Sequence, residues 1–255
     1  MSIGPDPQIG TSSIRNEAFN TTYTRGQILI DAMKDLTVKT VLDIGAYTGE
    51  TAEWFCRLFP KATIWSVEPV PESFVKLKSR GNPRVKPFHF AATNFEGTCT
   101  IFLNAAAHTN GLFPINSASR DSIDISTRRE ERLLNGLTLP ENQDQVEVPA
   151  RTLDSFVVEN GLSQIDFLKI DVQGAETVVL QGSHDVLRNT RAILIEVSLY
   201  DYYTQQNSIG DVEEFLRPSG FELWSITDQS NNPMNGRTDW VELLYLNRQL
   251  SHAKS

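Results

Sequence analysis

Two glycines that follow an acidic residue form the first chemically informative stretch of the chain, VLDIGAYTGE at residues 41–50. Their spacing is Asp43-x-Gly45-x-x-x-Gly49, between a predicted strand and a predicted helix. Glycines let the backbone approach a ligand closely and adopt positive φ, and the N-terminus of the following helix favours electron-rich groups. A carboxylate just before the first glycine would repel a pyrophosphate, whereas it suits a ligand with a positive charge.

A second acidic residue, Glu68, ends the next predicted strand nineteen residues beyond Gly49. An acid at about this distance is positioned to accept hydrogen bonds from ribose hydroxyls. Together the two stretches predict a site for a ribose and a cation without a phosphate, and S-adenosylmethionine meets that description. The alternative is that Gly45 and Gly49 only shape a turn and that Asp43 caps a helix.

A third stretch, IDFLKIDVQGAETVVLQG at residues 165–182, brings Lys169 and Asp171 to the carboxyl end of a predicted buried strand. In open α/β sheets, ligands bind outside the carboxyl ends of the strands. Asp171 is therefore expected in the same crevice as Asp43 and Glu68.

Four side chains are candidate bases for an alcohol nucleophile: Asp171, Glu196, His108 and His89. His89 alternates with phenylalanines on a predicted strand, which favours a structural role for it. Asp171 and Glu196 are expected near the ends of adjacent central strands, where they could share a proton or hold a metal ion. No zinc-site spacing is present in the sequence, and no metal site is predicted. Two structural alternatives stay open, namely a buried, paired acid for Glu196 and a surface loop residue for His108.

The elements that would hold these residues alternate regularly along the chain. Alternating strands and helices at this spacing mean βαβ units and a parallel sheet. The last two strands, joined by a short link with Asn, Pro and Gly, predict an antiparallel pair at the sheet edge. The predicted strands cover 40–45, 62–69, 85–92, 99–104, a segment from 145, 165–171, 191–200, 221–228 and 239–247, and the main helices 51–59, 71–80, 175–182 and 209–220.

One long polar segment, residues 105–145, interrupts this alternation. Long irregular stretches inside a compact domain are usually functional or disordered, so we expect this segment to cover the acceptor. Arg120, Arg128 and Arg129 could clamp an acidic acceptor, or they could belong to a solvated face. The predicted organisation is an N-terminal extension with helices at 1–37 and a catalytic domain at 38–255 that contains this insertion.

The composition limits the classes of partner. The formal net charge of −9 argues against a general affinity for nucleic acid or an anionic membrane. No run reaches the roughly 18 apolar residues that a membrane helix needs, and the N-terminus lacks a signal pattern. Cys56 and Cys99 show no disulfide framework. These features predict a cytoplasmic protein; a homodimer is one option for its oligomeric state, which the sequence leaves open.

Several stretches taken together resemble the FkbM family of S-adenosylmethionine-dependent methyltransferases. They are VLDIGAYTGE, WSVEPVPESF, FAATNFEGTCTIFL, TLDSF and LKIDVQGAE, and the resemblance covers roughly residues 38–200. It implies the Rossmann-like class I methyltransferase fold, an α/β architecture with a seven-stranded, mostly parallel sheet whose last strand is antiparallel. It also implies O-methylation, often of sugars, polyketides or other secondary metabolites.

The resemblance also implies roles for individual residues. Asp43, Gly45, Ala46 and Gly49 would frame the cofactor, and Glu68 would hold its ribose. Ala92 and Asn94 would lie near the adenine, and Asp171 would face the methyl group and the acceptor. The family commonly has Asn at the position of Tyr47 and Glu at the position of Gln173, so these two positions depart from its pattern.

Other functions remain as alternatives. A nicotinamide-dependent dehydrogenase is disfavoured because the third glycine and a phosphate-compatible turn are missing. A degenerate methyltransferase fold that serves as a binding module is disfavoured by the intact Asp43, Glu68 and Asp171. The net charge argues against an RNA methyltransferase. The expected partner is a small-molecule acceptor, a sugar, polyketide or peptide, whose nucleophile is a hydroxyl or a carboxylate.

Overall fold

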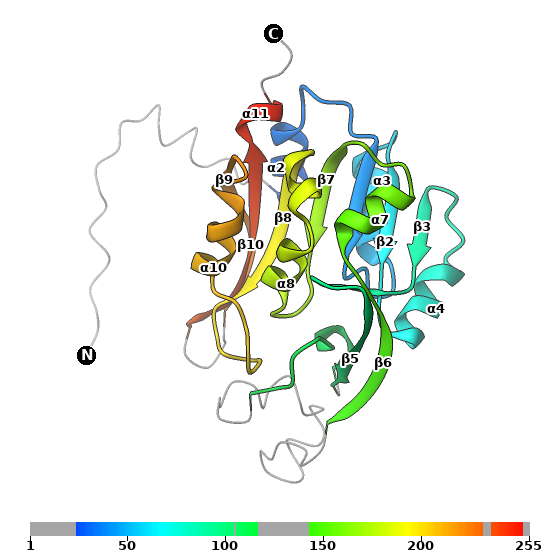
Figure 1. The fold of residues 1–255 in the computed structure, drawn as a ribbon. Helices are drawn as coiled ribbons and strands as arrows, with labels where there is room; N and C mark the ends of the chain where they lie inside the picture. Colours follow the sequence, from blue (N-terminus) through cyan, green and yellow to red (C-terminus); the bar gives the residue numbers. More distant parts are fainter. Residues whose placement is uncertain (1–23, 105, 117–142, 232–235, 252–255) are drawn as a thin grey trace, which may run out of the picture.

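A seven-stranded sheet forms the centre of the computed structural model, which describes residues 24–104, 106–116, 143–231 and 236–251 (Figure 1). In sheet order the strands are β3 (Val85–Phe88), β2 (Thr63–Val67), β1 (Thr40–Ile44), β7 (Ile165–Ile170), β8 (Thr190–Ser198), β10 (Thr238–Asn247) and β9 (Phe221–Asn231). Only β10 runs antiparallel to its neighbours, β8 and β9. This arrangement confirms the predicted class I architecture, including the antiparallel pair at the edge.

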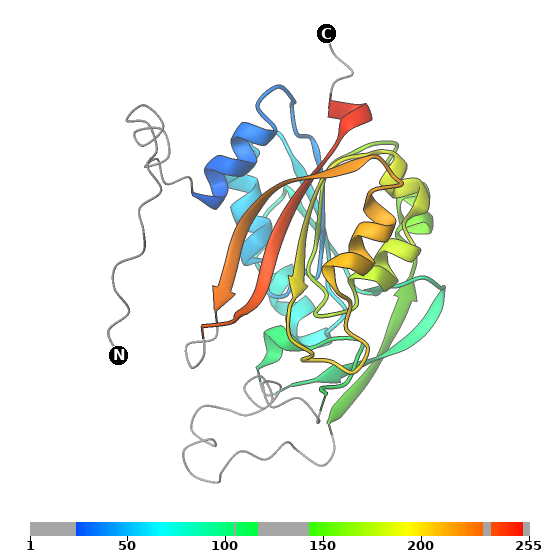
Figure 2. The same ribbon diagram turned by 90° about the vertical axis from the view of Figure 1, so that its left-hand side faces the viewer.

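Helices cover both faces of this sheet (Figure 2). On one face, α2 (Arg25–Ala32) and α3 (Glu50–Leu58) pack their apolar side chains, such as Leu29 and Phe55, against β1, β7 and β8. On the other face the core includes side chains from α7 (Leu153–Glu159), α8 (Glu176–Gln181), α9 (His184–Arg188) and α10 (Ile209–Leu216). Because β7 is buried on both faces, its sequence IDFLKI lacks the polar alternation of a half-exposed strand.

The predicted strand 85–92 is wrong in one respect, because it divides between two sheets. Residues 85–88 form β3, whereas β4 (Ala91–Ala92) joins a three-stranded sheet in the order β4-β6-β5. Its partners are β6 (Asp144–Arg151) and β5 (Gly97–Leu103). An apolar run gives no local sign of this change, because the pairing that causes it comes from a strand more than fifty residues later. The small sheet lies near the carboxyl ends of the parallel strands (Figure 1).

Part of the predicted covering segment lies within the described residues. Residues 106–116 contain a short 3₁₀ helix, Ala107–Thr109, and form two isolated β-bridges. Phe102 bridges Gly111, and Ile115 bridges Tyr203. The three arginines predicted to clamp an acceptor, Arg120, Arg128 and Arg129, lie outside the described residues, as do residues 1–23.

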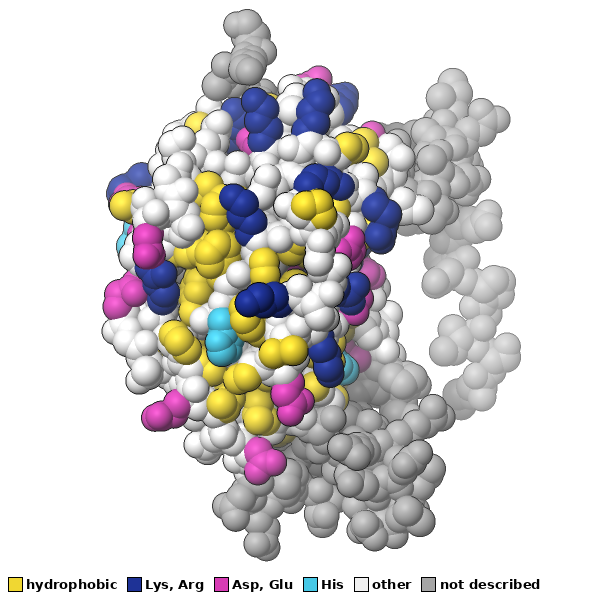
Figure 3. Space-filling view, turned by 90° about the vertical axis from the view of Figure 1, so that its right-hand side faces the viewer, with side chains coloured by type: hydrophobic (Ala, Val, Ile, Leu, Met, Phe, Trp, Pro, Cys, Tyr) yellow, Lys and Arg dark blue, Asp and Glu magenta, His cyan; other side chains and the backbone are white. Residues whose placement is uncertain are grey.

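Two features concern the predicted lack of nucleic-acid and membrane partners, namely the surface charge and the length of the helices. On the face that carries β3, α4 (Pro71–Ser79) and β6, Lys and Arg side chains are interspersed with Asp and Glu (Figure 3). The described residues of this face therefore present no uniformly basic surface for nucleic acid. Of the helices in the described ranges, none combines the length and the apolar character needed to cross a membrane.

The turn after β1 depends on Gly45, which has φ of +82° and lies against β7. A Cβ at this position would lie 1.8 Å from the main-chain oxygen of Asp171. We therefore expect Gly45→Ala to lower the free energy of unfolding by clearly more than the ~1–2 kcal/mol that a left-handed conformation alone costs an L-residue.

Urea unfolding measures this loss, and Gly161→Ala is the matched control. Gly161 also has positive φ, +66°, but an added Cβ would meet nothing within 4 Å. It should therefore show only the conformational cost. Equal losses in the two variants would contradict the close approach of the turn to β7.

Candidate active site

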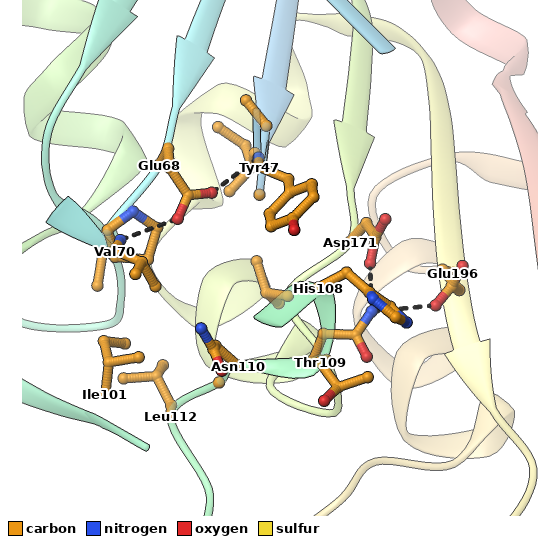
Figure 4. Close-up of a pocket in the computed structure, with 18 of the residues that line it drawn as sticks. Tyr47, Glu68, Val70, Ile101, His108, Thr109, Asn110, Leu112, Asp171 and Glu196 are labelled. Carbon is orange, nitrogen blue, oxygen red and sulfur yellow. Dashed lines mark hydrogen bonds between the residues drawn. The ribbon is translucent and has the colours of Figure 1, made fainter. Parts of the chain in front are cut away.

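A cavity of about 660 Å³ opens at the carboxyl ends of β1, β2, β7 and β8 (Figure 4). This volume lies within the range of about 300–1,000 Å³ that is usual for small-molecule sites. The predicted site residues that line it are Gly45, Ala46, Glu68, Ala92, His108, Asp171 and Glu196. The structure thus brings together residues that are spread over more than 150 positions of the sequence.

The Glu68 side chain is held rigidly at one end of the cavity. Its Oε2 accepts a hydrogen bond from the backbone N–H of Tyr47, and its Oε1 accepts one from that of Val70, each at 2.8 Å. Tyr47 makes its bond from a left-handed conformation, with φ of +49°. Burial raises the pKa of the Glu68 carboxyl to about 7, against the hydrogen bonds that lower it. The carboxyl group therefore changes its charge near neutral pH.

The backbone turn beside Glu68 is built by two successive N–H groups. Gly45 and Ala46 both donate to the carbonyl oxygen of Val67, each at 3.0 Å, which fixes the turn onto β2. Gly49 lies outside the cavity wall and begins α3 with φ of +92°. A Cβ there would lie 2.8 Å from Leu77, so its place in the structure is explained by packing against α4.

Asp43 lies beneath the cavity and does not line it, since its side chain is fully buried. Its Oδ1 lies 3.7 Å from the Lys169 ammonium group, and its Oδ2 accepts a hydrogen bond from the Ser66 hydroxyl at 3.4 Å. Burial raises the pKa of Asp43, and the charge of Lys169 opposes that rise. The cation that Asp43 faces is thus part of the protein, and Asp43 acts on the cavity through Lys169.

An acidic pair occupies the other end of the cavity. The Lys169 ammonium group donates to Asp171 Oδ2 at 3.0 Å, and the Gln173 amide donates to Asp171 Oδ1 at 2.8 Å and to Glu196 Oε1 at 3.3 Å. Burial and the nearby charge of Asp171 raise the pKa of Glu196 well above its ordinary value. Two acids that share one amide donor beside a cavity are typical of sites that move a proton.

Two remaining predicted residues have different surroundings. His108 lies in the 3₁₀ helix at the cavity border and is exposed, so its role as a base stays a prediction beside the alternative of a surface residue. Asn94 is exposed and outside the cavity wall, where its amide donates to Gln181 at 2.7 Å. Ala92, two residues earlier, does line the cavity, so the chain turns outward between them.

Sequence reasoning missed an apolar corner near Glu68. Val70, Ile101 and Leu112 line it, and they belong to one apolar cluster with the small second sheet (Figure 4). The sequence of β5 alternates between apolar and polar residues, which is the one local sign of this corner. Its pairing with β6 decides which face of β5 is buried. Opposite, the acidic end is bordered by Tyr202, Tyr203 and Trp240.

Across the part of the chain that the structure describes, no group of three or more His, Cys, Asp or Glu side chains could hold a metal ion.

Comparisons with known proteins include one family model and two methyltransferase relatives. The family model described as "Methyltransferase FkbM domain" matches residues 43–223. The chain is 30% identical over 185 residues to the 2-O-methyltransferase NoeI of Sinorhizobium fredii, with 72% of each chain covered. It is 26% identical over 199 residues to the 31-O-demethyl-FK506 methyltransferase FkbM of Streptomyces tacrolimicus, again with 72% of each covered.

A solved structure of an FkbM methyltransferase from Methylobacillus flagellatus is also similar to the chain, with a TM-score of 0.48 and 12% identity. That match covers 90% of this chain and 45% of the other. The range matched by the family model contains every predicted site residue, from Asp43 to Glu196.

The buried ion cluster around Lys169 yields a stability prediction. Lys169→Met leaves Asp43 buried without its cation, so we expect the free energy of unfolding to fall by about 3–5 kcal/mol. The double variant with Asp43→Asn should recover part of the loss, because it removes the unpaired charge. Urea unfolding at neutral pH measures both effects.

Lys78→Met is the matched control, since Lys78 is exposed on α4. It should change the free energy of unfolding by no more than about 0.5 kcal/mol. A Lys169→Met protein as stable as this control would show that the cluster does not hold the site together.

Proposed function

This chain belongs to the FkbM family of methyltransferases, and we propose that its cavity binds S-adenosylmethionine and directs the methyl group to a hydroxyl of a small-molecule acceptor. One observation carries the proposal. A single cavity has a backbone-fixed carboxyl, Glu68, at one end and the acidic pair of Asp171 and Glu196 at the other. The ligand it suits has a polyhydroxyl group at one end and a positive charge at the other.

The residues present fit this cofactor. Glu68 keeps lone pairs free beyond its two backbone hydrogen bonds, so it can accept from ribose hydroxyls. The apolar corner of Val70, Ile101 and Leu112 suits the flat face of an adenine. Backbone at Gly45 lies close enough for direct contact with a ligand, since no side chain intervenes.

A phosphate-bearing cofactor fits poorly. Among the described residues that line the cavity, Lys169 is the only Lys or Arg. It is almost fully buried and already paired with two carboxylates. A dinucleotide would place its pyrophosphate in a cavity without a free cation, which disfavours the nicotinamide-dependent alternative.

In the proposed reaction the acidic pair divides two tasks. When bound, S-adenosylmethionine supplies a methyl group activated by a sulfonium. Asp171, held by Lys169, would accept the proton of the acceptor hydroxyl as the hydroxyl oxygen bonds to the methyl carbon. The bond between that carbon and the sulfonium sulfur would break at the same time, and S-adenosylhomocysteine would be the leaving group. Glu196, whose raised pKa favours the protonated form, holds the acceptor by a hydrogen bond.

A hydroxyl acceptor fits this end better than a carboxylate. The Asp171 carboxylate would repel an acceptor carboxylate, whereas an acceptor hydroxyl can donate a hydrogen bond to it. The names of the two relatives, 2-O-methyltransferase and 31-O-demethyl-FK506 methyltransferase, describe methyl transfer at oxygen. These names support oxygen as the acceptor atom for this chain.

The proposal is tested by methyl transfer from S-adenosylmethionine with a radiolabelled methyl group to a panel of hydroxyl acceptors and matched carboxylates. We expect label only in hydroxyl compounds. Asp171→Asn should lower transfer by at least about 100-fold, the lower range for loss of a general base, while S-adenosylhomocysteine affinity stays within threefold.

Asp185→Asn, an exposed substitution of the same type on α9, is the control and should transfer at the normal rate. Label in carboxylates alone would contradict the hydroxyl assignment. Full transfer by Asp171→Asn would remove this residue from the chemistry.

The raised pKa of Glu68 predicts pH-dependent cofactor binding. Ribose hydroxyls donate to the ionised carboxylate, so binding below pH 7 must displace a proton. S-adenosylhomocysteine should therefore bind about tenfold more weakly at pH 6 than at pH 8. Calorimetric titration at several pH values measures this dependence.

Two variants identify the group responsible. Glu68→Gln should bind weakly with a flat pH profile, and Glu72→Gln, an exposed change on α4, should keep the profile of the unmodified protein. A flat profile in the unmodified protein would rule out ionisation of Glu68 as the linked event.

A further inference from the structure

We propose that Gln173 is a positioning residue, whose amide holds Asp171 and Glu196 as one pair and connects that pair, through Tyr203, to residues 106–112 at the cavity border. The proposal rests on the proposed function and deepens it, because the pair is where the methyl group and the acceptor would meet.

The hydrogen bonds of the Gln173 amide determine its orientation. Nε2 donates to Asp171 at 2.8 Å and to Glu196 at 3.3 Å, and Oε1 accepts from the Tyr203 hydroxyl at 3.1 Å. The reverse orientation would place the amide oxygen against two carboxyl groups. Because the Asp171 carboxylate, which accepts from the Lys169 ammonium group, has no proton to give to an amide oxygen, that orientation is unfavourable.

The backbone at Gln173 also indicates a specific role. Gln173 has φ of +58°, a left-handed conformation that glycine and asparagine adopt more easily. Residues keep such conformations where the surrounding structure holds them. A Cβ on Gly174 would lie 2.9 Å from the Tyr203 ring, and a Cβ on Gly111 would lie 3.2 Å from the Gln173 carbonyl oxygen. The turn is thus packed tightly between Tyr203 and the cavity border.

Tyr203 provides the link to the border segment. Its side chain is 2% exposed, and its hydroxyl lies 2.9 Å from the Thr109 carbonyl oxygen and 3.1 Å from Gln173 Oε1. A hydroxyl has one proton, so these two acceptors compete for it. Burial raises the pKa of Tyr203, so the hydroxyl stays protonated. The position of residues 106–112 therefore affects whether the Tyr203 hydroxyl donates to Thr109 or to Gln173.

A neutral amide at this position suits the charges around it. Glu196 is surrounded by three further acids, Asp171, Glu176 and Glu242, and by one cation, Lys169. The Gln173 amide adds no charge and donates a hydrogen bond to each member of the pair.

The first test follows the titration of Glu196 by carbon-13 NMR in protein labelled at glutamate carboxyls, with the signal assigned by its loss in Glu196→Gln. In Gln173→Met the donor to Glu196 is gone, so its titration midpoint should rise by about one pH unit. Gln173→Asn keeps the amide and suits the left-handed backbone, but it is too short to reach. It should show the same rise.

Gln181→Met, an exposed glutamine on α8, is the matched control and should leave the midpoint unchanged. A rise in both Gln173 variants, without one in the control, supports the proposal. An unchanged midpoint in both would overturn it. This test needs no cofactor, so its outcome does not depend on the proposed function.

The second test compares the affinities for S-adenosylmethionine and S-adenosylhomocysteine by calorimetry from pH 5.5 to 8.5. The two ligands differ by the charged methyl sulfonium, so their affinity ratio reports the charge of the acidic pair. Gln173→Met and Gln173→Asn should shift the pH midpoint of that ratio, while affinity for S-adenosylhomocysteine stays within threefold. An unchanged ratio and midpoint would overturn the positioning role. Failure of the unmodified protein to bind either ligand would instead contradict the proposed function.

Discussion

The site depends on one buried ion cluster, in which the Lys169 ammonium group lies between the carboxylates of Asp43 and Asp171. It joins the ends of β1 and β7, and it also donates to the carbonyl oxygen of Gly45 at 3.4 Å. A buried lysine is tolerated only when its charge is compensated, and here the two acids raise its pKa. The glycine turn, the acidic pair and the cavity between them are held in place by this contact.

The cavity has two chemically different ends, which together limit what it can bind. At one end Glu68 is fixed by backbone N–H groups next to an apolar corner that the second sheet helps to build. At the other end, the acidic pair of Asp171 and Glu196 lies near Tyr202 and Trp240. A ligand with a flat ring, a ribose and a positive charge satisfies both ends, whereas a phosphate would satisfy neither.

Much of this arrangement could be predicted from the sequence, because parallel strands bring their carboxyl ends to one edge of the sheet. That rule places Glu68, Asp171 and Glu196 together, as the structure confirms. Contacts made by side chains across the fold were not predictable. The partner of Asp43 is a lysine on another strand, 126 positions later. Asp43 and Gly49 were predicted to frame the cofactor, but both lie outside the lining of the cavity.

The second sheet was missed for a related reason. Ala91 and Ala92 continue an apolar run, but their pairing with Ala150 and Arg151 bends the chain into another sheet. The apolar corner of Val70, Ile101 and Leu112 follows from that pairing. Local patterns predict elements well, whereas long-range pairing decides which of their faces meet.

A crystal structure of the protein with S-adenosylhomocysteine bound tests the central claim most directly. The account predicts ribose hydroxyls within hydrogen-bond distance of Glu68, the adenine between Val70, Ile101 and Leu112, and the sulfur facing Asp171. Density for the ligand elsewhere, or a ribose that does not touch Glu68, would contradict it.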